Sequence, residues 1–490
     1  MHGGFVRPWK SATAEGRRWR FSMPWRERAQ PVRMERVALL APTPALREVL
    51  VRIADTGLIE LDKPGAVDAA ATEAGRRLQR IAGRSRVAPA LALQPPDLAV
   101  LERAGAADLL AGEAQLQERA AGAVPRRGVS GLTGWCPAPM VGSVVDRLTG
   151  TAGVLVPLHP PRGVDPPSLL RRDTSVRRSF APLVETYATV PYADVDPSPA
   201  AGVVFVVMFG AMFGDVGHGL LLLLVGLLLL RRRPSRIARF HTVWPFVVGA
   251  ALAAIFFGVL YGEFFGPTGV LPVLWLSPTD DPVQLLLAAI GFGAVLLAGA
   301  YVLGTVNRWR EGGARAALYA PSGLAGAAVF LGLGTAAAGL YSQRDTITLA
   351  GSGLALAGLV FAGIGLFAAA GGGGAAAAVA GVGLVDMVIR LGANLVSFAR
   401  LAAFGMTHAI IAAVVWAGTT ALAGRGLGYL AVAGLVFVVG NALAFTLEAL
   451  VAAVQALRLE YYELFSRVFD SAGRPFRPWH VPTFLEEDRS

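Results

Sequence analysis

Cysteine, charged residues and phosphate-binding loops are scarce or missing in this sequence, and each absence excludes a class of site. The single cysteine, Cys136, rules out an intrachain disulfide and any multi-cysteine metal site. Only 16% of the 490 residues are charged whereas 54% are hydrophobic, which is too apolar for a soluble globular protein of this length. No glycine-rich loop of the P-loop type occurs, so we expect that this chain does not itself hydrolyse ATP.

Lysine is rare as well. Lys10 and Lys63 are the only two, so arginine supplies nearly all of the positive charge behind a formal net charge of +10. In a membrane protein, an excess of basic residues is typical of cytoplasmic loops. We therefore predict contact with membrane lipid and no nucleic-acid partner.

Apolar residues are concentrated in one part of the chain, which predicts separate domains. Residues 1–33 are polar and Arg-rich, lack the apolar core of a signal peptide, and are expected to form a basic, disordered extension. Residues 34–195 have a soluble composition with strand and helix patterns, which predicts a small α/β cytoplasmic domain that docks to other proteins. Within it, 66–125 is expected to form a short helical arm interrupted by prolines. Residues 196–465 are predicted to be the membrane domain, and 466–490 a cytoplasmic tail.

The membrane part predicts an α-helical polytopic domain of about eight transmembrane helices. The apolar stretches are 198–213, 217–231, 243–263, 284–306, 317–341, 348–368, 388–416 and 428–460. The first two give roughly fifteen residues per crossing, fewer than the ~20 that a straight helix needs, so one long helix is the alternative. Two crossings put Arg231–Arg236 on the side of the N-terminal domain, as the positive-inside rule requires, with both termini cytoplasmic.

The last two stretches are long and carry charge. The final one has 33 residues, ~50 Å of helix against a hydrocarbon core of ~30 Å, so we expect long, tilted helices. Arg400 lies inside the seventh stretch, and Glu448, Gln455 and Arg458 lie inside the eighth. A charge at that depth costs ~2.5–3.5 kcal/mol even on lenient scales, so such residues indicate an ion pathway.

Polar residues on these two stretches recur at helical spacing. One stripe repeats every seven residues and consists of Asn441, Glu448, Gln455 and Tyr462, with Arg458 at its edge. On the preceding stretch one sector of ~100°, with Asn394 at its border, holds Asp386, Arg390, Ser397, Arg400, Thr407 and His408. Two facing polar stripes on apolar helices predict an aqueous path or two half-paths.

Plainer interpretations stand beside this one. Glu448 and Arg400 could form a structural ion pair between helices. Four other charged residues could extend their charged ends to the membrane surface, namely Arg390, Arg458, Glu460 and Arg467. His408 could be a hydrogen-bonded packing residue. Finally, the tight turn between the first two stretches could be capped and fixed by its two polar residues, Asp215 and His218.

Three segments of the membrane part closely resemble motifs of one family. They are MFGAMFGDVGHG, NLVSFARLAAFGMTHA and LEALVAAVQALRLEYYELFSRVF, and the family is the V-type/A-type ATPase a subunit, called subunit I in prokaryotes. RVALLAPTPALREVLVRIADTGLIELD resembles the N-terminal start of that family, and GLTGWCPAP and FAPLVETYATVPYADVDPSPA resemble its junction between soluble and membrane parts. The resemblance covers essentially Met34 to Pro478.

The resemblance implies a function and roles for individual residues. The family is the static partner of a rotating proteolipid c ring. By position, Arg400 matches its essential arginine, Arg458 a second arginine near the ring, and Glu448 a half-channel carboxylate. Three further residues match polar positions of the channels, namely His408, Asp386 and Gln455. Supporting polar roles fall to Asn394, Ser397, Asn441, Asp215 and His218.

The mechanism that this implies is physically consistent. A ring carboxylate must be neutral where it faces lipid, and a fixed guanidinium favours its ionised form. Arginine stays protonated and cannot relay the proton itself, so Arg400, aided by Arg458, would separate two proton half-channels. The candidate relays are Glu448, His408 and Asp386. Proton flow would then be coupled to ATP hydrolysis or synthesis on other chains.

The resemblance also implies partners. They are the proteolipid c ring, peripheral stalk subunits and a central-stalk cap subunit, in the cell membrane, without cofactor or metal. Relatives have a far longer arm between two α/β lobes, so the short segment 66–125 predicts a compact docking domain that contacts fewer stalk subunits. Two rival functions are a stand-alone ion-coupled secondary transporter, which should show two matching halves, and an intramembrane protease, which would need a nucleophile and base.

Overall fold

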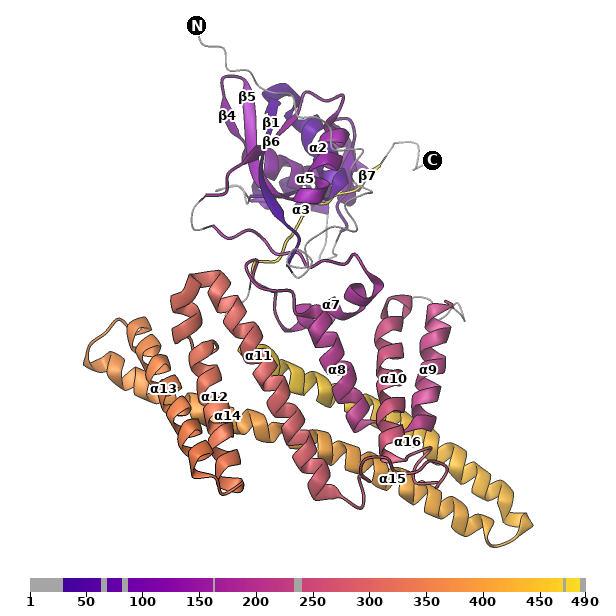
Figure 1. Ribbon diagram of the computed structural model, residues 1–490. Coiled ribbons are helices and arrows are strands. Elements are labelled where there is room, and N and C mark those ends of the chain that lie inside the picture. Colours follow the sequence, from indigo (N-terminus) through magenta and orange to yellow (C-terminus); the bar gives the residue numbers. More distant parts are fainter. Residues whose placement is uncertain are drawn as a thin grey trace. The chain divides into compact units, whose positions relative to one another are not determined.

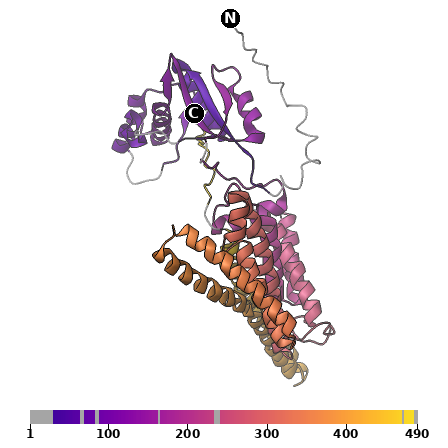
Figure 2. The same ribbon diagram turned by 60° about the vertical axis from the view of Figure 1, so that its left-hand side comes forward.

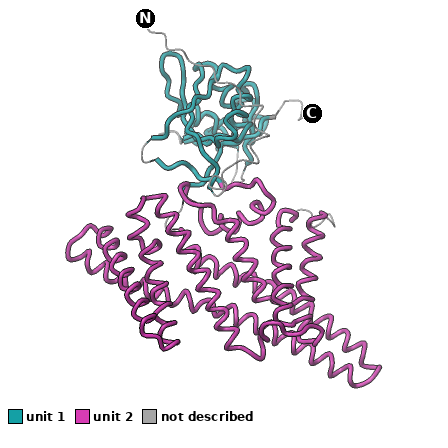
Figure 3. The backbone as a smooth tube through the Cα atoms, viewed as in Figure 1, with its two compact units in different colours: residues 1–169, 473–490 teal, residues 170–472 magenta. Residues whose placement is uncertain are grey.

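The computed structural model describes residues 30–62, 68–81, 87–161, 164–232, 240–469 and 473–484. The chain divides into two compact units, each described separately below (Figure 3). Unit 1 comprises residues 1–169 and 473–490, and unit 2 comprises 170–472. Most of the extension predicted at 1–33 lies outside the described residues.

Unit 1 is built on one sheet with the strand order β2-β5-β1-β6. The strands are β1 (Met34–Pro42), β2 (Glu60–Leu61), β5 (Val129–Pro137) and β6 (Val154–Leu158), and β4 (Val124–Arg126) pairs with β5. Leu39 of β1 lies opposite Leu132 and Leu155, so the two strand-forming portions of the sequence share one hydrophobic core. The N-terminal part is therefore compact, as the short helical segment predicted.

Helices cover this sheet. Helix α2 (Leu46–Thr56) buries Val49, Leu50 and Ile53 and ends at Gly57, whose φ of 58° is the left-handed conformation that glycine adopts easily. The other helices are α3 (Glu73–Ile81), α4 (Leu98–Arg103), α5 (Ala107–Ala121) and α6 (Val141–Leu148), and short 3₁₀ turns occupy Thr43–Ala45, Ala69–Ala71 and Ala138–Met140.

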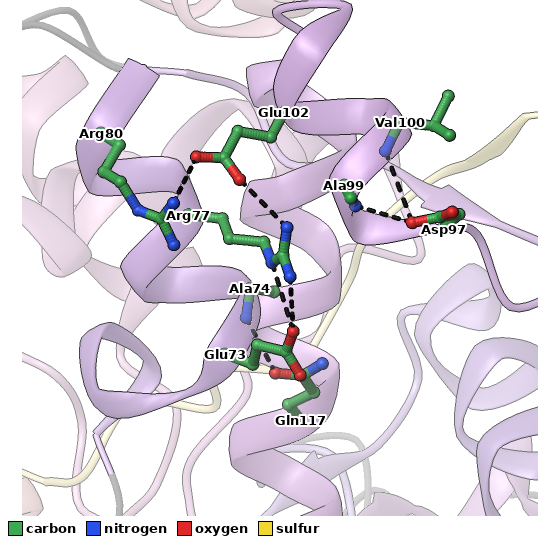
Figure 4. A network of polar contacts seen from close by, with 9 residues as sticks. All are labelled: Glu73, Ala74, Arg77, Arg80, Asp97, Ala99, Val100, Glu102 and Gln117. Carbon is green, nitrogen blue, oxygen red and sulfur yellow. Dashed lines mark hydrogen bonds and ion pairs between the residues drawn. The ribbon is translucent and has the colours of Figure 1, made fainter.

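The predicted arm is a small cluster of these helices. Arg77 on α3 pairs with Glu73 at 2.9 Å and with Glu102 of α4 at 3.1 Å, and Arg80 pairs with Glu102 at 2.8 Å (Figure 4). Gln117 of α5 accepts a hydrogen bond from the backbone of Ala74. The segment thus closes on itself through polar contacts instead of extending as a long helical pair.

The end of the chain returns to unit 1, which differs from the separate tail predicted at 466–490. Strand β7 (Thr483–Phe484) pairs in parallel with β3 (Leu91–Ala92), and Trp479 and Val481 are buried in the core of this unit. Residues 170–195 in turn belong to unit 2, because Phe180 of α7 (Ser175–Tyr187) packs on Gly202, where an added Cβ would lie 2.5 Å from Phe180 Cγ. The functional roles given to the predicted domains stay predictions.

Unit 2 is helical, which confirms the predicted polytopic membrane fold. Among the described residues, six helical stretches are long and apolar enough to cross a membrane, and two shorter apolar helices precede them. The helices are α8 (Ser198–Met212), α9 (Val216–Leu230), α10 (Trp244–Tyr261), α11 (Pro282–Tyr319), α12 (Leu324–Tyr341), α13 (Asp345–Ala369), α14 (Gly374–Ser397), α15 (Ala399–Ala423) and α16 (Leu430–Leu459). A 3₁₀ turn at Leu427–Tyr429 precedes α16, which continues as a π-helix (Glu460–Phe465) and α17 (Ser466–Val468).

The arrangement of these helices supports two features of the prediction. Helices α8 and α9 run in opposite directions, so this segment is two short helices and not one long helix (Figure 1). Helices α12 and α13 lie side by side in both views (Figures 1 and 2). The last helices, α14–α15 and α16, are long and run obliquely to the others, with α15 packed along α16 (Figure 1).

Candidate functional site

Arg400 lies at a break between two helices. Helix α14 ends at Ser397 and α15 begins at Ala399, with the fully buried Phe398 between them. The ring of Phe398 packs against Gly293 of α11, where an added Cβ would lie only 2.3 Å from Phe398 Cγ. This close packing fixes the break, and the break places Arg400 in the first turn of α15.

The guanidinium of Arg400 is only partly compensated. Its Nη2 lies 3.7 Å from Oε1 of Glu463, and its side chain is 24% exposed whereas that of Glu463 is 5% exposed. Arg400 Nη1 is buried and makes no hydrogen bond to any described residue. Both side chains line a cavity of ≈ 500 Å³ together with Ser397, Val454, Leu457, Arg458, Tyr461 and Tyr462.

The end of α16 departs from the predicted stripe. Arg458 is exposed in the last helical turn, and Gln455 has a buried Oε1 without a described partner. From Glu460 the chain is a π-helix, which has more residues per turn and so rotates less per residue than an α-helix. Tyr462 is consequently 67% exposed, whereas the side chain of Glu463 is buried. Tyr462 still lines the cavity beside Arg400, and Glu463 joins it there as a buried carboxylate that the predicted stripe did not include.

The positions at the membrane surface suggested for Glu460 and Arg467 were wrong. Glu460 is fully buried, and neither of its carboxylate oxygens has a partner among the described residues. Arg467 is also buried, with its guanidinium 5.7 Å from the centre of the Tyr301 ring. When the amide of Asn394 is oriented to satisfy both of its atoms, it donates to Arg390 O and accepts from Arg467 Nη2 at 3.3 Å. Both charged side chains are therefore enclosed within unit 2 and do not extend to its surface.

A second polar cluster joins α15 to α16. Nδ1 of His408 contacts Oε2 of Glu448, and His408 is nearly fully buried. His408 Nε2 and Glu448 Oε1 are buried without a partner in the described parts of the chain. The structure therefore pairs Glu448 with His408, and the alternative of a Glu448–Arg400 ion pair is wrong. Arg400 faces Glu463 instead.

Asp215 and His218 lie beside this cluster. Asp215 caps α9: its Oδ1 accepts hydrogen bonds from the backbone of His218 at 2.9 Å and Phe265 at 3.0 Å, and its Oδ2 accepts one from Gly266 at 2.7 Å. The capping interpretation is confirmed for Asp215. His218 is fully buried, and its ring centre is 5.4 Å from that of His408. Neither ring nitrogen makes a hydrogen bond to a described residue, and Nδ1 lies 3.8 Å from Oδ1 of Asp215.

Polar atoms of this second cluster are close enough to consider a metal. One ligand atom each from Asp215, His218 and His408 lies within 4.8 Å of the others, and all three residues are buried. However, the oxygens of Asp215 already accept three backbone hydrogen bonds, and Glu448 already occupies one nitrogen of His408. The same three residues together with Glu448 also fit a short series of groups that exchange protons. The expectation that the chain binds no metal stays a prediction.

Other predicted residues lie apart from these clusters. Asp386 pairs with Arg390 at 2.7 Å, and both side chains are exposed on α14. Asp386 is 14 residues before Arg400, or ~21 Å along a helix, so the structure does not bring them together. Ser397 lines the Arg400 cavity while its hydroxyl bonds Ala393 O at 3.0 Å. Asn441 is buried and donates to Phe437 O at 2.9 Å.

Sequence reasoning missed two buried acids. Glu463 is the carboxylate nearest to Arg400, and its position depends on a π-helix that no spacing rule reveals. Glu263 is buried just after α10, and its backbone N–H and C=O bond Gly258 and Val216. A signal for Glu263 existed, since an acid inside the apolar run YGEFFG is unusual.

Comparison with known proteins relates these clusters to one family. The profile of the V-type ATPase 116kDa subunit family matches residues 132–273. A-type ATP synthase subunit I of Thermococcus kodakarensis is 26% identical over 371 residues, which cover 71% of this chain and 53% of that protein. Subunit I of Halobacterium salinarum is 29% identical over 397 residues, covering 66% and 53%. V-type proton ATPase subunit a1 of Arabidopsis thaliana is 30% identical over 145 residues, covering 27% and 18%.

These similarities confirm the resemblance inferred from the motifs. The chain spans about half the length of the A-type relatives that it matches. The family profile includes the Asp215–His218 turn but ends before Arg400. Together with the apolar helices, the similarities support a multi-pass membrane protein that resembles subunits of A-type and V-type ATPases.

Proposed function

We propose that this chain is the static membrane subunit of a rotary V/A-type ATPase and forms two proton half-channels against a rotating proteolipid c ring. The observation that carries the proposal is the environment of Arg400. Its guanidinium lies in a partly open cavity, with one nitrogen unpartnered among the described residues and one carboxylate at 3.7 Å. A membrane cation with unused hydrogen-bond donors is suited to an anion that arrives from outside the chain.

Arg400 acts as the barrier in this mechanism. A ring carboxylate that reaches the guanidinium is stabilised as the anion and gives up its proton on the side it came from. Arg458, in the same cavity, adds positive charge and strengthens this effect. Because arginine does not release its own proton, no proton passes directly between the two half-channels.

The His408–Glu448 pair acts as the relay of one half-channel. Both groups can gain and lose protons, they touch, and each keeps one buried atom free of described partners. His218 and Asn441 extend this polar region. Gln455, Ser397 and Asp386 belong to the approach on the side of the Arg400 cavity and α14.

The same proposal assigns partners and location. The chain is non-catalytic, ATP is hydrolysed or made on other subunits, and the N-terminal unit docks to peripheral stalk and central-stalk cap subunits. Both termini are cytoplasmic, and the protein resides in the cell membrane. The names of the A-type and V-type relatives support an ATPase assembly in general, and the finer assignments are ours.

Purification from native membranes tests the proposal. A tagged chain should co-elute with a proteolipid ring and with subunits that hydrolyse ATP, and the chain alone in lipid vesicles should not transport ions. Ion transport by the purified chain without partners would instead support a secondary transporter and contradict the proposal.

A further inference from the structure

The ion pair between Arg400 and Glu463 is incomplete on both sides. The 3.7 Å separation between Nη2 and Oε1 exceeds the 2.7–3.2 Å of a protein hydrogen bond. Arg400 Nη1 and Glu463 Oε2 are both buried and have no partner in the described parts of the chain. Each group therefore balances part of the other's charge and keeps some capacity for a third group in the same cavity.

The position of Glu463 is fixed by the π-helix and not by the ion pair. Tyr461 Oη donates to Leu183 O of α7 at 2.8 Å. The ring of Tyr187, also on α7, has its centre 5.6 Å from that of Tyr461 and 5.4 Å from that of Phe465. These contacts hold the π-helix from the outside, so Glu463 stays in place when Arg400 changes its partner.

We propose that Glu463 is a positioning residue, a resident counter-ion that holds Arg400 between the visits of successive ring carboxylates. The inference rests on the proposed function. An arriving carboxylate bonds the free Nη1 and competes with Glu463 for the guanidinium, which has five N–H donors. When the ring advances, Glu463 takes Arg400 back and so speeds release of the departing carboxylate. Arg458 shares the cavity and balances the charge of Glu463 while Arg400 is engaged.

Other charged and titratable groups around the π-helix define what must be kept constant in a test. They are Tyr187 of α7, Arg400, Arg458, Glu460, Tyr461, Tyr462 and Arg467. From α11, Tyr301 lies beneath Arg467, and on α14 Asp386 pairs with Arg390. Helix α8 carries no titratable side chain. Among these described groups, only Arg400 lies within ion-pair range of Glu463, at 3.7 Å.

The test is Glu463→Gln in the intact complex, reconstituted in vesicles. Without its competitor, Arg400 should retain each ring carboxylate longer, so coupled ATP turnover should fall about 10-fold while the protons pumped per ATP stay unchanged. Acid protonates the retained carboxylate and frees it, so the pH optimum should move down by about one unit. Glu463→Asp keeps the charge and should recover most of the turnover.

Glu460→Gln is the matched control, because it changes a buried carboxyl on the same π-helix that has no described cation partner. It should leave the pH optimum where it is. Unchanged turnover and pH optimum in Glu463→Gln would overturn the positioning role, as would loss of assembly or of coupling, which indicates a structural role. If Arg400→Ala itself retained pumping, the proposed function would fail instead, so the two failures are distinguishable.

Discussion

Arginine has different surroundings in the two units. In unit 1, Arg36 bonds both carboxylate oxygens of Asp62, and Arg77 lies between Glu73 and Glu102. In unit 2, the guanidinium of Arg400 comes no closer than 3.7 Å to a carboxylate of the described residues, and Arg458 makes no hydrogen bond to them. Arg36 and Arg77 are thus paired with carboxylates of unit 1, whereas Arg400 and Arg458 keep unused donors.

This difference is informative because the surroundings of the two units favour the opposite pattern, with unpaired arginines in water and paired arginines in the membrane. Exposed ion pairs in water contribute only ~0–1 kcal/mol, so unit 1 would lose little by leaving its arginines unpaired. Inside a membrane an uncompensated charge is much more costly, so complete pairing would be expected there. Incomplete pairing at the costly location is the sign of an arginine that binds something outside the chain.

The strongest test of this comparison is Arg400→Ala. We expect proton pumping and the coupled part of ATP turnover to be abolished, because nothing then stabilises the ionised ring carboxylate or separates the half-channels. Assembly should be largely intact, since Arg400 has only one partial internal partner. ATP-driven acidification of vesicles measures the effect. Arg425→Ala is the control, because Arg425 is exposed in the loop that follows α15 and should leave acidification unchanged. Near-normal acidification by assembled Arg400→Ala complexes would refute the role of Arg400.

Glu448→Gln should have the next largest effect. A relay is lost while the arginine barrier remains, so translocation should slow by roughly 100-fold, the low end for a lost proton-transfer group, without uncoupling. The rate of vesicle acidification and the ATP turnover should fall in parallel. If the variant fails to insert or fold, the His408–Glu448 contact is a structural pair and the relay assignment is wrong.

The smallest effect is expected for Asp62→Asn in unit 1, and it concerns the free energy of unfolding of that unit. Burial alone would raise the pKa of Asp62, but hydrogen bonds from Arg36 and Thr133 and the charge of Arg36 lower it below 3.8 overall. A lowered folded-state pKa stabilises the fold above the unfolded-state value, and this stabilisation is lost as the pH falls through the folded-state value. Because Asp62 is partly exposed, we expect a loss on the order of 1 kcal/mol at pH 7, which shrinks below pH 4.

Cys136 provides the measurement for this variant. It is the only cysteine, it is fully buried in β5, and burial raises the pKa of its thiol to about 12. Its reaction with a dithiodipyridine, which also labels thiols in acid, therefore reports unfolding of unit 1 in urea. Proton pumping per assembled Asp62→Asn complex should be unchanged. Equal urea midpoints for the variant and the original chain at pH 7 would show that the Arg36–Asp62 pair does not stabilise unit 1.

The sequence predicted elements better than it predicted contacts. Long apolar runs identified the membrane helices, and the short α8–α9 pair followed from the charge of Arg231–Arg236, because hydropathy and charge act locally. The same local signals, together with the family resemblance, selected Arg400, His408 and Glu448 as candidates. The carboxylate beside Arg400 was not predicted, because a helical wheel assumes 3.6 residues per turn and the chain from Glu460 is a π-helix that buries Glu463.

The return of the chain end to unit 1 was also missed. Residues 473–484 contribute a two-residue strand, two core residues, Trp479 and Val481, and polar contacts such as that of Arg474 with Glu60. Such a short segment has no periodicity of its own, and its fit depends on a core formed more than three hundred residues earlier. Long-range complementarity of this kind is not encoded in local patterns.

Cross-linking tests most directly whether the Arg400 cavity faces a rotating ring. Val454 lines that cavity and is exposed, so Val454→Cys in a Cys136→Ser background should form a disulfide with a cysteine placed beside the ring carboxylate. ATP turnover before oxidation should spread the cross-link over tagged and untagged ring subunits alike. Val382→Cys, exposed on α14 away from the cavity lining, is the control and should not cross-link. Absence of a cross-link from Val454→Cys, or an equal yield from Val382→Cys, would contradict the account.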